Sequence, residues 1–290
     1  MKLLIIGTGL MGTSFKTLCP DAVILGEQDI DITQPEKFPS IIDPIAPDMI
    51  INCAAYTNVD KAEIEQDKTN LINGTAVGYL AAYAASRDII LVHFSTDYVF
   101  DGQGTRPYLE DDVPAPMNAY GYSKWLGEVA LAKHGKNTYM FRIQWIYGKN
   151  GGNFVEAIRK KARETGHLDV VNDQWGSPTW SLDLAQKIGQ FLQLSASKTT
   201  ERPPFGIYHV AATGQTNWHD FAREILAQTG IPASLAAIDS QAIPRPAKRP
   251  TNGRLNCEKF AQYAALPMPW QEGLRHYLRS LQQDTQNTNA

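Results

Sequence analysis

Short apolar runs recur along the first half of the chain and constrain its fold more than any other feature. Each run is rich in Val, Ile and Leu and is followed by a longer segment with a helical pattern, such as TAVGYLAAYAAS. The runs, in chain order, are KLLIIG, AVILGE, DMIINCAA, IILVHFST and TYMFRI. Continuous apolar strands joined by helices are typical of a parallel sheet that is covered on both faces. We therefore predict an α/β fold with a doubly wound parallel sheet.

The regular alternation weakens near residue 150, which indicates a second and smaller lobe. Beyond this point, SLDLAQKIGQFLQL has the pattern of a helix that returns to the first domain, and FGIYHVA has the pattern of one more strand. A chain of 290 residues with 43% hydrophobic content has enough apolar material for both parts. We predict a first domain at 1–150, to which 179–212 returns, and an interleaved smaller lobe at 151–178 and 213–290.

Charge and cysteine content argue against several classes of function. The formal net charge is −3, so the chain lacks the overall positive field that favours binding of nucleic acid. The cysteines Cys19, Cys53 and Cys257 are widely spaced and form no Cys-x-x-Cys or Cys/His group. We therefore expect neither a disulfide framework nor a zinc site. No stretch approaches the ~18 apolar residues of a membrane span, so we expect a cytoplasmic protein with no membrane or nucleic-acid partner.

A glycine-rich loop follows the first predicted strand. In LLIIGTGLMGTSF, three glycines have G-x-G-x-x-G spacing between a strand and a helix. Gly7 permits the tight turn, Gly9 lets the backbone approach a pyrophosphate, and Gly12 permits close packing of the helix on the strand. Leu10 and Met11 then open the helix whose N-terminus faces the phosphates. In this context the motif predicts that the first domain is of the Rossmann type and binds a dinucleotide.

Carboxylates follow the second predicted strand. Glu27, Asp29 and Asp31 stand near the position where a ribose hydroxyl or the adenine amino group would lie, and spacing alone does not separate them. No Arg or Lys occurs between Asp21 and Pro35 to meet a 2′-phosphate. We therefore expect NADH or NADPH as the cofactor, with NADH favoured.

The segment YGYSK at 120–124 contains two tyrosines, of which one is a candidate for catalysis. Positions four apart share a helix face whereas positions two apart do not, so Lys124 accompanies Tyr120 and not Tyr122. We expect the lysine to lower the pKa of the Tyr120 phenol and to hold the cofactor ribose. Thr96, next to Ser95, ends a predicted strand, where ligands bind in open α/β sheets. A hydroxyl, a phenol and a lysine so placed suit carbonyl reduction.

An ordered set of motifs resembles the extended short-chain dehydrogenase/reductase family over nearly the whole chain. The motifs are GTGLMG, DIT, NCAAYTNVDKAE, LINGT, STDYVFDG, YGYSKWLGE, RIQWIYG, NDQWGSPT, GIYHVAATGQTNW and RPTNGRL. The resemblance implies an oxidoreductase that uses NADH or NADPH to reduce the 4-keto group of a dTDP-linked 6-deoxysugar. The first expectation for that sugar is dTDP-4-dehydro-L-rhamnose, which gives dTDP-L-rhamnose.

The same resemblance implies roles for single residues. It makes Thr96, Tyr120 and Lys124 the catalytic group, with Asn73 supporting the lysine through ordered water. The positions that match cofactor contacts are Asp31 and Ile32 at the adenine, and Cys53, Ala54, Ala55 and Tyr56 along the diphosphate and nicotinamide. The positions that match deoxysugar contacts are Thr96, Asp97 and Trp145.

This chain also departs from the family pattern. Members usually have Arg-Thr-Ser-Trp where this chain has Ile143 and Gln144 between Arg142 and Trp145, which leaves the exact sugar open. Some members bind magnesium at a dimer contact through a glutamate near position 14 of this chain. Thr13 and Ser14 occupy that neighbourhood here, so we expect no metal site and favour a monomer over a homodimer.

The basic loop PRPAKRPTNGR is a candidate partner for the diphosphate of a nucleotide sugar. Arginine forks bind such oxygens bidentately, and the resemblance makes Arg249 the first candidate. The alternative is a solvated basic loop. His93, His209 and His219 lack metal-ligand spacing, and we expect them to serve packing.

Two other functions stay open at this point. The chain is a reductase or epimerase of another nucleotide sugar, or it is a catalytically silent, dinucleotide-binding regulatory subunit of another enzyme. The complete Thr96, Tyr120 and Lys124 group argues against the silent subunit.

Overall fold

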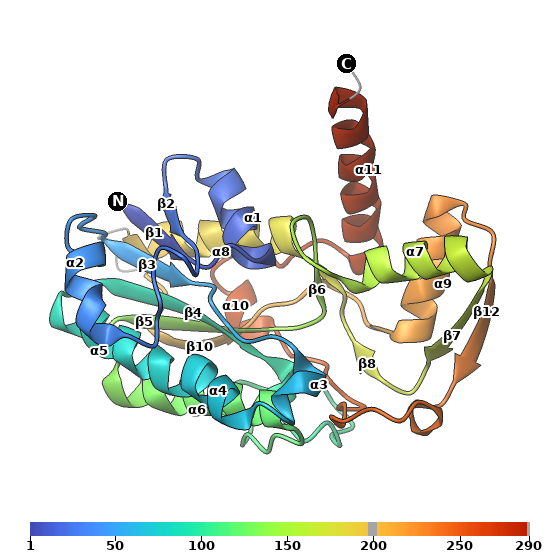
Figure 1. The fold of residues 1–290 in the computed structure, drawn as a ribbon, viewed down its shortest axis with the longest axis horizontal. Coiled ribbons are helices and arrows are strands. Elements are labelled where there is room, and N and C mark those ends of the chain that lie inside the picture. Colours follow the sequence, from blue (N-terminus) through green and yellow to red (C-terminus); the bar gives the residue numbers. More distant parts are fainter. Residues whose placement is uncertain (197–201, 289–290) are drawn as a thin grey trace.

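Six parallel strands form the main sheet of the computed structural model, which describes residues 1–196 and 202–288 (Figure 1). Their order across the sheet is β10-β5-β4-β3-β1-β2. The strands are β1 (Leu3–Ile6), β2 (Val23–Leu25), β3 (Met49–Asn52), β4 (Ile90–Thr96), β5 (Thr138–Ile143) and β10 (Gly206–His209). The five apolar runs and FGIYHVA contain these strands, so the prediction of a doubly wound α/β fold is confirmed.

Helices cover both faces of this sheet because alternate residues of each strand point to opposite sides. Ile5 belongs to one hydrophobic cluster, whereas Leu4 and Ile6 belong to the other. The first face is covered by α1 (Leu10–Leu18), α8 (Ser181–Ala196) and α10 (Glu258–Ala261). The second face is covered by α2 (Phe38–Ile42), α5 (Ala76–Ser86) and α6 (Ala119–His134). The short elements of this part are η1 (Pro35–Lys37), α3 (Val59–Ala62), α4 (Gln66–Asn70), the π-helical turn η2 (Leu71–Thr75) and η3 (Asp97–Val99).

A smaller lobe lies beyond the carboxyl ends of the sheet strands (Figure 1). Its helices are α7 (Phe154–Thr165), α9 (Trp218–Thr229) and α11 (Trp270–Thr288), with the turn η4 (Ser240–Ala242). Its strand pairs are β7 (His167–Val171) with β12 (Ser234–Ile238), β8 (Trp175–Gly176) with β11 (Thr216–Asn217), and β6 (Ile146–Tyr147) with β9 (Thr179–Trp180). Apolar residues of the three helices form a separate core that includes Val155, Phe221 and Leu274.

The chain crosses between the two parts several times. α8 returns to the main sheet, where Ser14 of α1 donates a hydrogen bond to Ser181. After the lobe, Leu255 and Cys257 pack in a cluster beside the sheet, and Phe260 joins the first sheet cluster. The predicted division into domains stays a prediction, and residues 197–201 and 289–290 of its ranges lie outside the described residues.

Candidate active site

The glycine loop joins β1 to α1 in a conformation that requires small residues. Gly7 has a φ of +102°, and a Cβ there would lie 2.7 Å from the backbone nitrogen of Ala54. A Cβ at Gly12 would lie 1.9 Å from the carbonyl oxygen of Gly7, so this position needs glycine for packing. A Cβ at Gly9 would meet no atom within 4 Å. The backbone at Gly9, where a pyrophosphate is predicted, is therefore open to a ligand.

A cavity of about 1150 Å³ lies at the carboxyl ends of the parallel strands. We call it the main cavity. Of the predicted cofactor residues, those that line it are Gly7, Gly9, Leu10, Met11, Glu27, Asp31, Ile32, Cys53, Ala54, Ala55, Tyr56, Tyr120 and Lys124. Gly12 does not line the main cavity and packs behind the loop. The open backbone at Gly9 and the N-terminus of α1 within this cavity fit a dinucleotide with its diphosphate at the loop.

The three carboxylates after β2 differ in their surroundings. Asp29 accepts a hydrogen bond from the backbone nitrogen of Gly26 at 2.8 Å, and Asp29 does not line the main cavity. Asp31 accepts hydrogen bonds from the hydroxyl and backbone nitrogen of Thr33, which lower its pKa. Glu27 is exposed at the cavity wall. Glu27 and Asp31 are both exposed at the cavity wall, so either can face a ribose, whereas Asp29 does not line the cavity.

The start of α6 decides which tyrosine faces the main cavity. Asn118 caps the helix by accepting a hydrogen bond from the backbone nitrogen of Gly121 at 2.7 Å. Tyr120 then lies in the first turn and Lys124 one turn later, and both line the cavity. Tyr122 is 44% exposed. The predicted helix-face geometry is therefore present.

The acidity of Tyr120 differs from the expectation. Burial raises its pKa to about 12, and the charge of Asp97 adds to this increase. A hydrogen bond with Thr96 acts in the opposite direction. The expectation that the pKa of Tyr120 is lowered is wrong for this structure, because burial disfavours the charged phenolate. The phenol is therefore fully protonated at neutral pH and is available as a proton donor.

Lys124 is buried, with 3% of its surface exposed, and has a polar neighbour behind the cavity. Its Nζ lies 3.5 Å from Nε2 of His93, whose Nδ1 lies 3.2 Å from the side-chain nitrogen of Asn52. Burial lowers the pKa of Lys124 to about 8, although the charge of Glu128 opposes this change. Burial and the lysine charge also hold the pKa of His93 well below its usual value. His93 thus contacts the site, and the expectation of a packing role alone missed that contact.

Asn73 lies in the π-helical turn η2 and connects two segments of the site. Its Oδ1 accepts a hydrogen bond from the backbone nitrogen of Tyr56 at 2.8 Å. Its Nδ2 donates to the backbone oxygen of Tyr56 and to Oγ of Ser123, both at 2.9 Å. Asn73 thereby fixes the cofactor segment that contains Tyr56 to α6, between Tyr120 and Lys124. Its support of the lysine through water stays a prediction.

The predicted sugar contacts also line the main cavity. Thr96 donates a hydrogen bond to Asp97 at 3.1 Å and accepts one from the backbone nitrogen of Tyr98 at 3.2 Å. Burial raises the pKa of Asp97 to about 7. The ring of Trp145 stacks on that of Trp218, with centroids 3.6 Å apart, so one face of the predicted sugar platform is covered.

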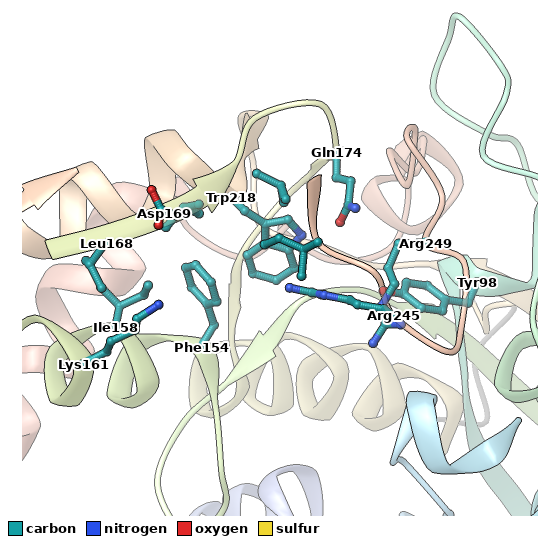
Figure 2. A pocket seen from close by; sticks show the side chains of 13 residues that line it. Tyr98, Phe154, Ile158, Lys161, Leu168, Asp169, Gln174, Trp218, Arg245 and Arg249 are labelled. Atoms are coloured by element: carbon teal, nitrogen blue, oxygen red, sulfur yellow. The ribbon is translucent and has the colours of Figure 1, made fainter. Parts of the chain in front are cut away.

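A second cavity of about 250 Å³ adjoins the main cavity and is called the small cavity here (Figure 2). Tyr98 and Trp218 line both cavities. In the small cavity, Phe154 extends from α7 towards Trp218, and Arg245 and Arg249 lie at the end near Tyr98. The small cavity therefore combines aromatic rings with the two arginines, and Lys161 also lines it.

Arg249 lines the small cavity but is already paired. Its Nη1 and Nη2 donate to the two carboxylate oxygens of Asp60 at 2.6 and 2.7 Å. This bidentate bond lowers the pKa of Asp60 and ties the loop after η4 to α3 of the first domain. The solvated-loop alternative does not describe Arg249. Its predicted contact with a diphosphate stays a prediction.

Several residues that line the two cavities were not predicted from the sequence. Thr8 lies between Gly7 and Gly9 and lines the main cavity. Its position inside the glycine motif could therefore have indicated a place beside the cofactor. Lys68 of α4 lines the same cavity, and its Nζ lies 5.7 Å from the ring centroid of Tyr56. Phe154 and Trp218 come from distant segments, and no local pattern predicts that they meet.

Two features are absent from the part of the chain that the structure describes. Residues 1–196 and 202–288 contain no group of three or more His, Cys, Asp or Glu side chains arranged to hold a metal ion. Within the same part of the chain, no helix combines the length and the apolar character that a membrane crossing requires.

Comparisons with known proteins show the family to which this chain belongs. Residues 1–283 match the family model described as the RmlD substrate binding domain. The chain is 40% identical over 258 residues to the dTDP-4-dehydrorhamnose reductase of Shigella flexneri, which covers 87% of this chain and 85% of the relative. The structure of a dTDP-4-dehydrorhamnose reductase from Clostridium acetobutylicum has 33% identity and a TM-score of 0.91, and covers 97% of this chain and 100% of that one. The enzyme from Bacillus anthracis in complex with NADP has 32% identity, a TM-score of 0.89 and the same coverage. The chain therefore belongs to the RmlD substrate-binding-domain family.

Proposed function

We propose that this chain is an NAD(P)H-dependent reductase of the 4-keto group of a dTDP-linked 6-deoxysugar, with dTDP-4-dehydro-L-rhamnose as the first substrate. The observation that carries the proposal is the junction of the two cavities at Tyr98 and Trp218. One cavity holds the glycine loop with Thr96, Tyr120 and Lys124, and the other offers rings and cations suited to a nucleotide diphosphate. The names of the relatives indicate the same reaction.

The cofactor lies in the main cavity. When bound, a reduced nicotinamide dinucleotide supplies hydride to a carbonyl carbon. Gly9 and the N-terminus of α1 hold the diphosphate, and Glu27 accepts hydrogen bonds from the adenosine ribose. NADH is favoured because Glu27 repels a 2′-phosphate. The Bacillus anthracis relative holds NADP, and Lys68 is a cation in the same cavity, so the preference is modest.

Side chains at the end of β4 and the start of α6 bind the ketone oxygen and protonate it. The Thr96 hydroxyl turns from Asp97 to donate to the ketone oxygen and orients it, and Tyr120 gives its proton to the developing alkoxide. The phenolate that remains lies one helical turn from the Lys124 ammonium, which stabilises it. Lys124 is mainly protonated at pH 7 because its pKa is about 8.

The nucleotide of the substrate lies in the small cavity. Phe154 and Trp218 offer apolar faces to the base and deoxyribose, and Arg245 with Arg249 meets the diphosphate. Arg249 then binds both Asp60 and the phosphate oxygens, or exchanges one for the other. The sugar reaches past Tyr98 towards Thr96 in the main cavity.

A panel of 4-keto nucleotide sugars tests the proposal against the alternatives. We expect oxidation of NADH or NADPH with dTDP-4-dehydrorhamnose and slower oxidation with UDP- and GDP-linked ketosugars. Ile143 and Gln144 replace smaller residues of the family pattern. The panel therefore includes other dTDP-linked ketosugars as well. Absence of cofactor oxidation with every sugar, together with co-purification of an unrelated enzyme, indicates the silent regulatory subunit. A cytoplasmic location and a monomeric state stay predictions.

A further inference from the structure

Gln144 follows β5 and presents a buried amide at the wall of the main cavity. Its side chain lines the cavity, yet the residue is only 2% exposed. Neither Oε1 nor Nε2 has a hydrogen-bond partner. Buried polar atoms are almost always paired, and an unpaired amide destabilises the fold unless a ligand satisfies it. The amide therefore indicates a ligand at this position.

The backbone around Gln144 leaves room for its amide. A Cβ at Gly176 would lie 2.9 Å from Oε1 of Gln144 and 2.6 Å from Cε2 of Trp145. Gly176 is thus required for the amide and the indole to pack side by side. The predicted sugar platform and the unpaired amide share one wall of the cavity.

A second unpaired polar atom packs against a neighbouring glycine segment. Oδ2 of Asp97 has no partner, and a Cβ at Gly253 would lie 2.3 Å from it. Gly253 and Gly176 belong to adjacent backbone segments, because the nitrogen of Gly253 donates to the oxygen of Trp175 at 2.8 Å. Asp97 follows Thr96 directly, so these atoms flank the predicted position of the ketone.

We propose that Gln144 is a specificity-determining residue that binds a ring hydroxyl of the hexose next to the reacting ketone. The inference rests on the proposed function. A hydroxyl both donates and accepts hydrogen bonds, and the amide offers one group of each kind. The serine that is usual at this position in the family has a side chain two bonds shorter. Gln144 therefore reaches a ring hydroxyl that a serine would not contact directly.

The test compares the binding of two ligands to the whole chain in the presence of NAD⁺. Calorimetry with dTDP-L-rhamnose and with dTDP is carried out on the wild type, on Gln144→Met, which keeps the volume without the amide, and on Gln144→Ser. We expect Gln144→Met to weaken dTDP-L-rhamnose binding by ~10- to 100-fold and to leave dTDP binding unchanged. Gln174→Met is the matched control in the small cavity, and its effect should be equal for the two ligands. Melting temperature and NADH binding verify the fold of each variant.

Two results would overturn the assignment. One is a Gln144→Met variant that binds dTDP-L-rhamnose as tightly as the wild type does, and the other is a wild type that binds dTDP-L-rhamnose no more tightly than dTDP. Turnover is measured in parallel. A wild type that shows the expected binding pattern without oxidising NADH or NADPH contradicts the proposed reduction and leaves the role of Gln144 intact.

Discussion

Replacement of Lys124 by methionine should lower turnover strongly and at the same time stabilise the fold. The pKa of this lysine is about 8 in the folded chain, compared with 10.5 for an unperturbed lysine. Between these values the unfolded chain binds the additional proton, so this group makes the folded state more stable as the pH rises. Below pH 8 the lysine is charged in both states, and burying that charge costs about 3 kcal/mol.

Lys124→Met removes the charge and keeps most of the packing volume. We expect the free energy of unfolding to rise by up to about 3 kcal/mol at pH 7 and by about 1 kcal/mol at pH 9.5, because the wild type has by then lost most of the penalty. The loss of the His93 contact at 3.5 Å reduces this gain only slightly. Turnover should fall by ~100-fold or more, because the phenolate of Tyr120 loses its counter-charge.

Urea unfolding at the two pH values measures the first effect, and NADH oxidation measures the second. Lys133→Met is the matched control, because Lys133 lies on the same helix and is exposed. Its stability should change by less than ~1 kcal/mol and by the same amount at both pH values. A Lys124→Met variant that is less stable than the wild type at pH 7, or equally stabilised at both values, refutes the reasoning.

Three further predictions test separate parts of the site. Tyr120→Phe should lower turnover by ~100-fold or more with little change in cofactor binding, whereas Tyr122→Phe should retain near-normal turnover; equal losses would contradict the helix-face argument. The wild type should have a lower Michaelis constant for NADH than for NADPH, and Glu27→Arg should shift the preference towards NADPH; steady-state kinetics with tenfold better use of NADPH by the wild type would argue against this view of Glu27. Gly12→Ala should lower the melting temperature and weaken NADH binding, since the new Cβ would lie 1.9 Å from the carbonyl oxygen of Gly7; unchanged NADH fluorescence titrations would show that the loop adapts.

The parts of the fold that depend on local pattern could be predicted from the sequence. Every apolar run lies on a strand of the main sheet, because a parallel strand buried on both faces has to be apolar throughout. The spacing of Gly7, Gly9 and Gly12 already implied a tight turn, an open backbone and close packing. The four-residue separation of Tyr120 and Lys124 was enough to place both at the main cavity.

Properties that depend on distant segments could not be predicted. The pKa of Tyr120 is raised mainly by burial in the assembled cavity. Helix periodicity does not predict how deeply a side chain is buried there. The bond between Arg249 and Asp60 joins residues 189 positions apart. The small cavity likewise brings Phe154 of α7 together with Trp218, a junction that no local pattern predicts.

Transfer of deuterium from the cofactor to the sugar is a direct test of the proposed hydride transfer. The wild type is incubated with dTDP-4-dehydrorhamnose and NADH deuterated at the transferable position of the nicotinamide, and the product is examined by mass spectrometry and NMR. We expect dTDP-L-rhamnose with one deuterium at carbon 4 and stoichiometric oxidation of NADH. A product without deuterium at carbon 4, or unchanged substrate with intact NADH, would contradict it.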